Sequence, residues 1–105
     1  MSAGKFIILD ARLEQCEDKG ASVGEAATAE IKSLSVDHAV IGLAVKDSAM
    51  VSLDQLRVSN AEICMTAYRK KQEFGGGLIK FESAICGDAE NVVQKGSYLA
   101  EVIRE

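Results

Sequence analysis

Residues 39–45 read AVIGLAV, a short run that is almost wholly apolar. Such a run is typical of a β-strand covered on both faces, because neither set of alternate side chains is polar. Directly after it, Asp47 or Ser48 can cap a helix. The apolar stripe of that helix would run from Met50 to Cys64. The centre of the chain therefore predicts a buried strand followed by an amphipathic helix.

The C-terminal part predicts two more strands and a helix. Gly75–Gly77 separates a polar segment, 67–74, from an alternating one, 78–86, and this arrangement favours a β-hairpin. Asp88 can cap a last helix, with Glu90 in its first turn, where a negative charge is favourable. We expect that helix to continue to the C-terminus.

The N-terminal part predicts one strand and one helix. Lys5–Leu13 contains four consecutive apolar residues and favours a strand. Ser22 and Glu25 have the spacing of a capping box, which predicts a helix over residues 22–35. The order from residue 39 is then βαββα, the split-βαβ or ferredoxin-like plan without its last strand. The strand at 5–13 can fill that vacancy, so the sequence predicts a circularly permuted α+β fold. We expect a four-stranded, mainly antiparallel sheet with three helices and no internal repeat.

Composition narrows the class of protein. The chain has 105 residues, is 48% hydrophobic and carries a formal net charge of −4. These values are typical of one folded domain, residues 1–105, rather than of a disordered chain. Its acidic balance argues against nucleic acid as a partner, and no apolar run approaches the ~20 residues of a membrane span. Three cysteines, an odd number, favour a reducing cytoplasm.

The residues that could carry chemistry are few. His38, the single histidine, could act as a general base, but an exposed residue at a strand end is the simpler interpretation. Cys64 and Cys86 fall at apolar positions and are interpreted as small core residues, whereas Cys16 lies in a polar segment. No nucleophile motif accompanies any of them, so we predict that the protein is not an enzyme.

Several segments together resemble the shell proteins of bacterial microcompartments (the BMC domain). The segments that carry the resemblance are Lys5–Arg12, Ile41–Val45, Ser48–Cys64, Phe74–Ile79 and, above all, Gly87–Val93, which is similar to the family's GDV-type helix start. Lys5–Arg12 stands at the N-terminus here, as in the circularly permuted class of propanediol, ethanolamine and glycyl-radical microcompartments. Ala89 departs from the family pattern, and Ala61 stands near the place of its edge lysine.

The resemblance implies a homohexameric shell tile in the bacterial cytoplasm, with other shell proteins as partners and small metabolites passing through a central pore. Glu73, Phe74, Gly75, Gly76 and Gly77 would line that pore, and Arg12 and Arg57 would lie at the hexamer edge. A ring of six Glu73 side chains would select permeants by charge.

Two alternatives remain open. Some proteins of this superfamily hold an iron–sulfur cluster at the pore through one cysteine from each of several subunits, and Cys16 would be the ligand here. The other alternative is a small ferredoxin-like regulatory module that binds a metabolite between chains. Neither alternative is separated from the shell tile by the sequence.

Overall fold

The computed structural model describes residues 4–70, 73–94 and 96–101, and these contain strands and turns but no helix. The predicted α+β ferredoxin-like fold is therefore wrong. The described residues form seven strands: β1 Lys5–Glu14, β2 Lys19–Val23, β3 Thr28–Lys46, β4 Met50–Tyr68, β5 Leu78–Ile85, β6 Glu90–Val93 and β7 Tyr98–Glu101. Lys5–Leu13, residues 39–45 and residues 78–85 are confirmed as strand, whereas the three expected helices are not present in the described segments.

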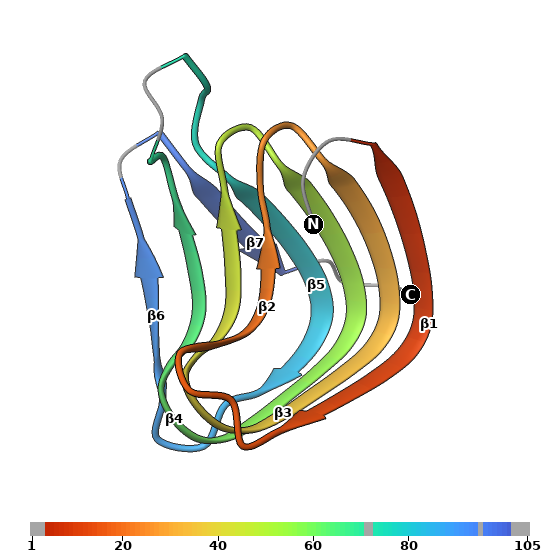
Figure 1. Cartoon of the computed structure of the whole chain (residues 1–105), viewed down its shortest axis with the longest axis vertical. Coiled ribbons are helices and arrows are strands. Elements are labelled where there is room, and N and C mark those ends of the chain that lie inside the picture. Colours follow the sequence, from red (N-terminus) through yellow and green to blue (C-terminus); the bar gives the residue numbers. More distant parts are fainter. Residues whose placement is uncertain (1–3, 71–72, 95, 102–105) are drawn as a thin grey trace.

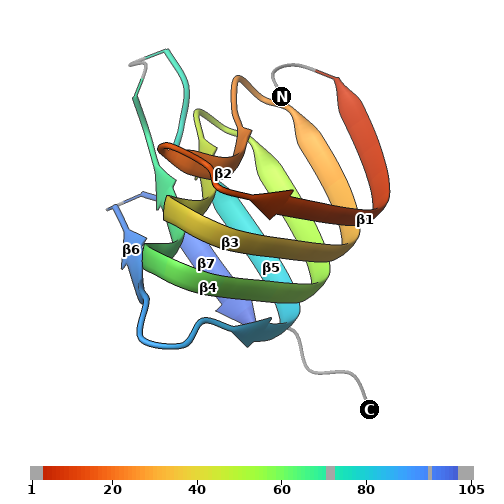
Figure 2. The same ribbon diagram turned by 60° about the horizontal axis from the view of Figure 1, so that its bottom comes forward.

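All pairings are parallel, and the chain winds as a β-solenoid. Strands stack in the order β1-β3-β4-β5-β7, with β2 on β3 and β6 on β4 (Figures 1 and 2). Lys5 pairs with Thr28, and Thr28 with Met50, one coil further along the chain. Met50 in turn pairs with Leu78, and Leu78 with Tyr98. Each coil thus places equivalent residues directly beside one another.

One corner of the solenoid is turned by a single residue per coil. Gln15, His38 and Asn60 occupy equivalent places in successive coils, and each has a positive φ, between 54° and 60°. Gly87, between β5 and β6, has a φ of 59°. Long strands β3 and β4 pass through this corner, so each contributes to both walls of the solenoid (Figure 1). A left-handed residue reverses the chain here without any hairpin.

The core is built from ladders of equivalent side chains that point inward. In β3 the buried residues of the first wall are Ala29, Ile31, Leu34 and Val36, and in β4 they are Val51, Leu53, Leu56 and Val58. Stacking one ladder on the next removes apolar surface from water, and this is the main stabilising contribution expected for such a fold.

The helical spacing in the sequence arises from a bend in each long strand. Lys32 and Ser33 lie between two buried residues, Ile31 and Leu34, so the in–out alternation slips by one position. Leu53 and Leu56 repeat the same slip in β4. A spacing of three inside an alternating strand imitates the i, i+3 pattern of a helix. The expectation of no internal repeat is also wrong, since the slip recurs one coil further along the chain.

Gly75–Gly77 does not form a hairpin, because β4 and β5 are parallel. The segment connects two coils and is hydrogen-bonded to the preceding connection: Ser48 N–H donates to the Gly75 carbonyl, and Gly75 N–H donates to Ser48 Oγ. The helix expected from Asp88 is also corrected, since β6 and β7 occupy its described part, and residues 102–105 lie outside the described residues.

Candidate binding face

The polar outer surface of the first wall is the best candidate for a functional site. It is formed by two adjacent outward-facing ladders on β1, β3, β4 and β5. Their register pairs Asp10 with Ser33 and Gln55 with Ser83, and it pairs Arg12 with Ser35 and Ser35 with Arg57. We call the following set the arginine–serine face: Arg12, Ser33, Ser35, Gln55, Arg57 and Ser83.

Three hollows adjoin one another across this face. Their volumes are about 280, 320 and 710 Å³, and Arg12 lines all three. Ser35 and Arg57 line the first two, and Ser33 and Gln55 the first and third. Arg57 also lines an open groove of about 950 Å³ beside the left-handed corner. The hollows therefore form one extended surface that crosses several coils.

The two arginines differ in their electrostatic surroundings. Arg12 has two carboxylates close to it on its own strand, since Asp10 and Glu14 each lie two positions away and are exposed on the same side. Arg57 has Ser35 and Ile85 beside it in the ladder. Both side chains are exposed, and neither forms an ion pair with a carboxylate of the described residues. The positive charge of Arg57 is the less compensated of the two.

Below the arginine–serine face, a hydrogen-bond network holds the corner. Asn60 Nδ2 and Ser59 Oγ donate to Asp37 Oδ1, at 2.7 and 2.9 Å, and His38 Nδ1 lies 2.9 Å from Asp37 Oδ2. The hydrogen bonds from Asn60, Ser59 and His38 lower the pKa of the Asp37 carboxyl from 3.8 to about 2. Asp37 thus remains ionised at neutral pH. His38 is exposed, as the simpler sequence interpretation has it.

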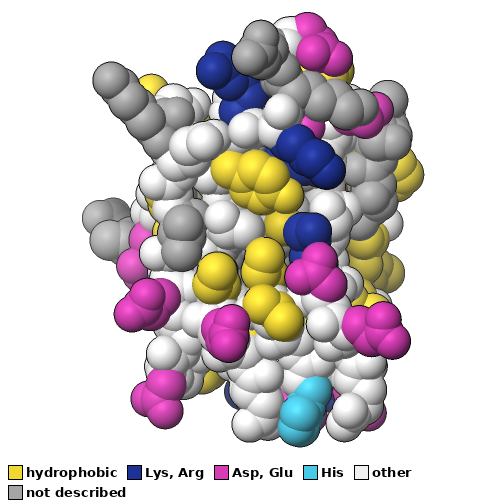
Figure 3. Space-filling model, turned by 60° about the vertical axis from the view of Figure 1, so that its left-hand side comes forward, with side chains coloured by type: hydrophobic (Ala, Val, Ile, Leu, Met, Phe, Trp, Pro, Cys, Tyr) yellow, Lys and Arg dark blue, Asp and Glu magenta, His cyan; other side chains and the backbone are white. Residues whose placement is uncertain are grey.

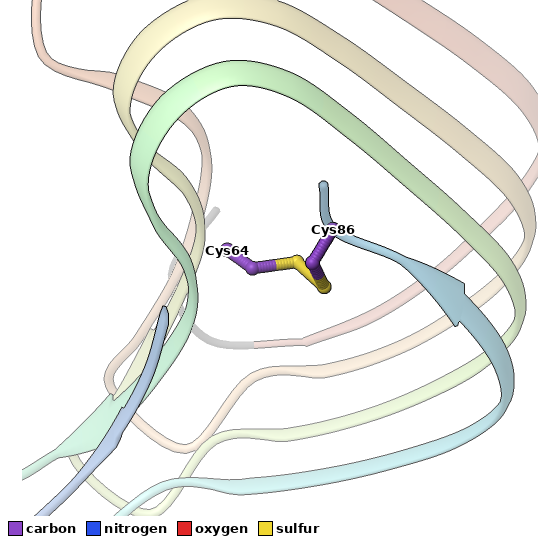
Figure 4. Close-up of a disulfide and its surroundings, with 2 residues drawn as sticks. All are labelled: Cys64 and Cys86. Carbon is purple, nitrogen blue, oxygen red and sulfur yellow. A yellow bond between two sulfur atoms is a disulfide. The ribbon is translucent and has the colours of Figure 1, made fainter. Parts of the chain in front are cut away.

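The cysteines are arranged differently from the prediction. Cys64 is fully buried, as expected, but it forms a disulfide with Cys86 across the interior (Figure 4). Cys16 is free and partly buried, and it packs against the core just after the corner residue Gln15. No group of three or more His, Cys, Asp or Glu residues in the described part of the chain is arranged to hold a metal ion.

The disulfide stands where the other coils have a glycine facing a valine. Gly20 and Gly42 are the counterparts of Cys64 in the two preceding coils, since Lys19 pairs with Ile41 and Ile41 with Ile63. A Cβ on Gly20 would lie 2.5 Å from Val36, and one on Gly42 would lie 2.7 Å from Val58. The third coil fills the same space with two sulfur atoms.

The residues predicted to line a pore lie together in the connection before β5. Glu73 and Gly75 are exposed, Phe74 is half-buried and Gly77 is buried. A Cβ on Gly76 would overlap Ser97 Oγ, and a Cβ on Gly77 would overlap the Val45 carbonyl oxygen. These two glycines are thus explained by close packing between neighbouring coils.

Of the residues named from the sequence, Arg12 and Arg57 are brought together, two strands apart in one ladder. Sequence reasoning missed their neutral neighbours Ser33, Ser35 and Gln55. The signal was available: aligning the chain with itself at an offset of 22 or 23 residues places Arg12, Ser35 and Arg57 in one column.

The second wall presents a different surface. Figure 3 views the molecule from the β6 side and shows acidic side chains around a small apolar group. Val40 and Val93 are exposed apolar residues of this wall, with 40% and 43% of their surface accessible. The same view also shows Lys and Arg side chains on this side of the molecule.

Comparisons with known proteins do not add an identity. No family model, curated protein or solved structure matches the chain. Among the described residues, none forms a helix of the length and apolarity needed to cross a membrane.

Proposed function

We propose that the protein is a non-catalytic binding module that holds an acidic polysaccharide across the coils of its arginine–serine face. The observation that carries the proposal is the column Arg12–Ser35–Arg57, in which two exposed arginines without ion-pair partners among the described residues flank a hydroxyl. The described residues do not form the fold on which the shell-tile prediction depended, so that function is not carried forward.

The spacing of the coils supports an extended ligand. Neighbouring strands of a sheet lie about 4.8 Å apart, so Arg12 and Arg57 are separated by roughly 9.6 Å at the backbone. One strand spacing is close to the length of a sugar unit in a linear polysaccharide. A chain laid across the strands would thus meet one side chain of the ladder at each successive unit: Arg12, then Ser35, then Arg57.

The chemistry of the face supports an acidic and hydroxylated ligand. Arginine presents a planar fork of donors that matches a carboxylate or sulfate with two parallel hydrogen bonds. Ser33, Ser35, Gln55 and Ser83 can donate to or accept from sugar hydroxyls, since hydroxyl and amide groups do both. The hollows above these residues leave room for a ligand on the surface.

Two observations support binding without catalysis. Asp37, the carboxyl that lines a hollow together with Arg12 and Arg57, has a pKa of about 2 and cannot serve as a proton donor near neutral pH. Ser59 donates to Asp37 rather than to His38, so these residues do not form a chain from nucleophile to base. The absence of enzyme activity stays a prediction.

The disulfide favours an oxidising compartment over the cytoplasm that the odd cysteine count predicted. We propose that the protein works outside the reducing cytoplasm, where acidic polysaccharides are also found. The cytoplasmic location is thereby replaced by a proposal that rests on one bond, Cys64–Cys86.

The proposal is tested by calorimetric titration with polygalacturonate, a linear polyuronate, and with dextran, a neutral glucan, as its control. We expect polygalacturonate to bind and dextran not to bind. Arg57→Ala is expected to weaken binding about 10- to 100-fold, because one charge-assisted hydrogen bond is worth roughly 1.5–3 kcal/mol. Raising the salt concentration should weaken binding of the wild type as well.

Lys80→Ala is the matched control, since Lys80 is exposed on β5 and lines none of the hollows described above. It removes one positive charge and should leave the affinity unchanged. Equal losses in Arg57→Ala and Lys80→Ala would mean that net charge alone drives binding. Failure of the wild type to bind polygalacturonate would refute the proposed function.

A further inference from the structure

β1 lies at one end of the stack of coils that the structure describes. Among the described residues β1 pairs only with β3, and it lies outermost in the stack (Figure 2). Its inward-facing residues Phe6, Ile8 and Leu13 are only partly buried. Ile7 and Leu9, on the outer side, expose 68% and 73% of their surface. An edge of ten residues with this much apolar surface is a site for pairing with another strand.

The side-chain pattern of β1 is symmetric about its centre. From Lys5 to Glu14, exposed and half-buried residues alternate, except that Leu9 and Asp10 are two exposed residues in succession. The pattern is therefore the same when it is read in either direction. An antiparallel neighbour with the same sequence would therefore place inward residues opposite inward residues. Phe6 would face Leu13 of a second copy, and Ile8 would face its Ala11.

We propose that β1 is the contact surface for a second copy of this chain, paired antiparallel about a two-fold axis between Leu9 and Asp10. A two-fold axis perpendicular to the sheet keeps the inner faces of both sheets on the same side. The apolar interiors of the two solenoids then become continuous, and the half-buried side chains at the end of each stack are covered.

The charges at the two ends of the strand agree with this register, whereas Asp10 and Arg12 lie opposite Leu9 and Ile7. Lys5 lies opposite Glu14 of the second copy, and the symmetry makes this contact twice. Both side chains are exposed and able to reach across. Within one chain, the Lys5 amine already lies 4.0 Å from Glu30 Oε1, at the limit of an ion pair, and both side chains are more than half exposed there. That contact leaves Lys5 able to bind a second carboxylate.

The experiment uses two charge reversals, Lys5→Glu and Glu14→Lys, and sedimentation velocity of the full chain. We expect the wild type to be a dimer of 11.2 kDa subunits. Each variant alone places like charges at both symmetric contacts, and we expect its dimer to dissociate roughly 10- to 30-fold more readily. An equimolar mixture of the two variants restores opposite charges at both contacts, so the heterodimer should regain the wild-type affinity.

Lys80→Glu is the matched control, since Lys80 is an exposed lysine on β5, and β3 and β4 lie between it and β1. Thermal unfolding of each variant, followed by circular dichroism, separates a loss of pairing from a loss of folding. A wild type that stays monomeric up to about 100 μM overturns the proposal. A dimer that both variants leave intact, or that their mixture does not restore, also overturns it, because the contact then lies elsewhere. These outcomes are independent of polysaccharide binding.

Discussion

The Cys64–Cys86 disulfide offers the most direct test of how the stack is stabilised. It links β4 to the residue after β5 through the interior, at a sequence separation of 22 residues (Figure 4). For a closed loop of this length, the lost entropy of the unfolded chain corresponds to about 3 kcal/mol. We expect reduction of the disulfide to lower the free energy of unfolding by that amount, a large part of the roughly 5–15 kcal/mol typical of a small domain.

The structure also supplies the substitution that removes the cross-link without leaving a hole. Since the two preceding coils place glycine opposite valine at this level, Cys64→Gly combined with Cys86→Val copies the contact of Gly42 with Val58. We expect this double variant to fold and to lose about 3 kcal/mol, plus roughly 0.5–1 kcal/mol for glycine in a strand. The midpoint of thermal unfolding should fall by roughly 10–25 °C.

Urea unfolding followed by circular dichroism measures these losses, with and without a reductant. Cys16→Ser is the control, because it removes the one free thiol of the described residues and keeps the cross-link. We expect the reductant to shift the urea midpoint of the wild type and of Cys16→Ser, and not that of the double variant. A reduced wild type as stable as the oxidised protein would refute the reasoning, since the loop closed by Cys64 and Cys86 would then contribute nothing.

Two further predictions concern the corner and the coil connections. Hydrogen bonds stabilise the Asp37 carboxylate in the folded protein, so its contribution to the free energy of unfolding is present above pH 3.8 and is lost as the pH falls to about 2. The urea midpoint of the wild type should therefore drop more over this pH range than that of Asp37→Asn. Parallel drops in the two proteins would contradict this role of Asp37. Gly77→Ala should cost roughly 1–3 kcal/mol of stability in urea unfolding, because its Cβ overlaps the Val45 carbonyl, which belongs to the backbone and cannot rotate away. Gly75→Ala, whose added Cβ would meet only Ser48 Oγ at 3.3 Å, should cost less, and equal losses would show that the close approach at Gly77 is unimportant.

The interpretation of helices failed for a specific reason. Leu53 and Leu56 have a helical spacing, and Ser48 is a plausible N-cap, so a local view of residues 48–64 favours a helix. In the solenoid the same spacing is the slip at the bend of β4, and Met50, counted in the helical stripe, has 46% of its surface exposed. The β-branched residues Val51 and Val58 favour a strand, but a rule based on spacing alone does not distinguish β-branched from other apolar residues.

The candidate face could be predicted only in part. Arg12 and Arg57 were singled out as edge residues through a family resemblance, whereas Ser35 between them was not considered. The missing information was the offset of 22 or 23 residues that brings the three into one ladder. Once a repeat is recognised, this column can be read from the sequence; without it, the three residues are unrelated positions far apart in the chain.

The apolar core, the acidic balance and the strands at Lys5–Leu13, 39–45 and 78–85 follow from the amino-acid sequence, because they depend on composition and on alternation within a few residues. The parallel stacking of the coils, the contact of Cys64 with Cys86 and the place of β1 at an edge follow from the folded chain. Those features depend on contacts between residues that are a full coil apart in the chain. Their stability comes from burying one coil against the next, which no single stretch of the chain can specify.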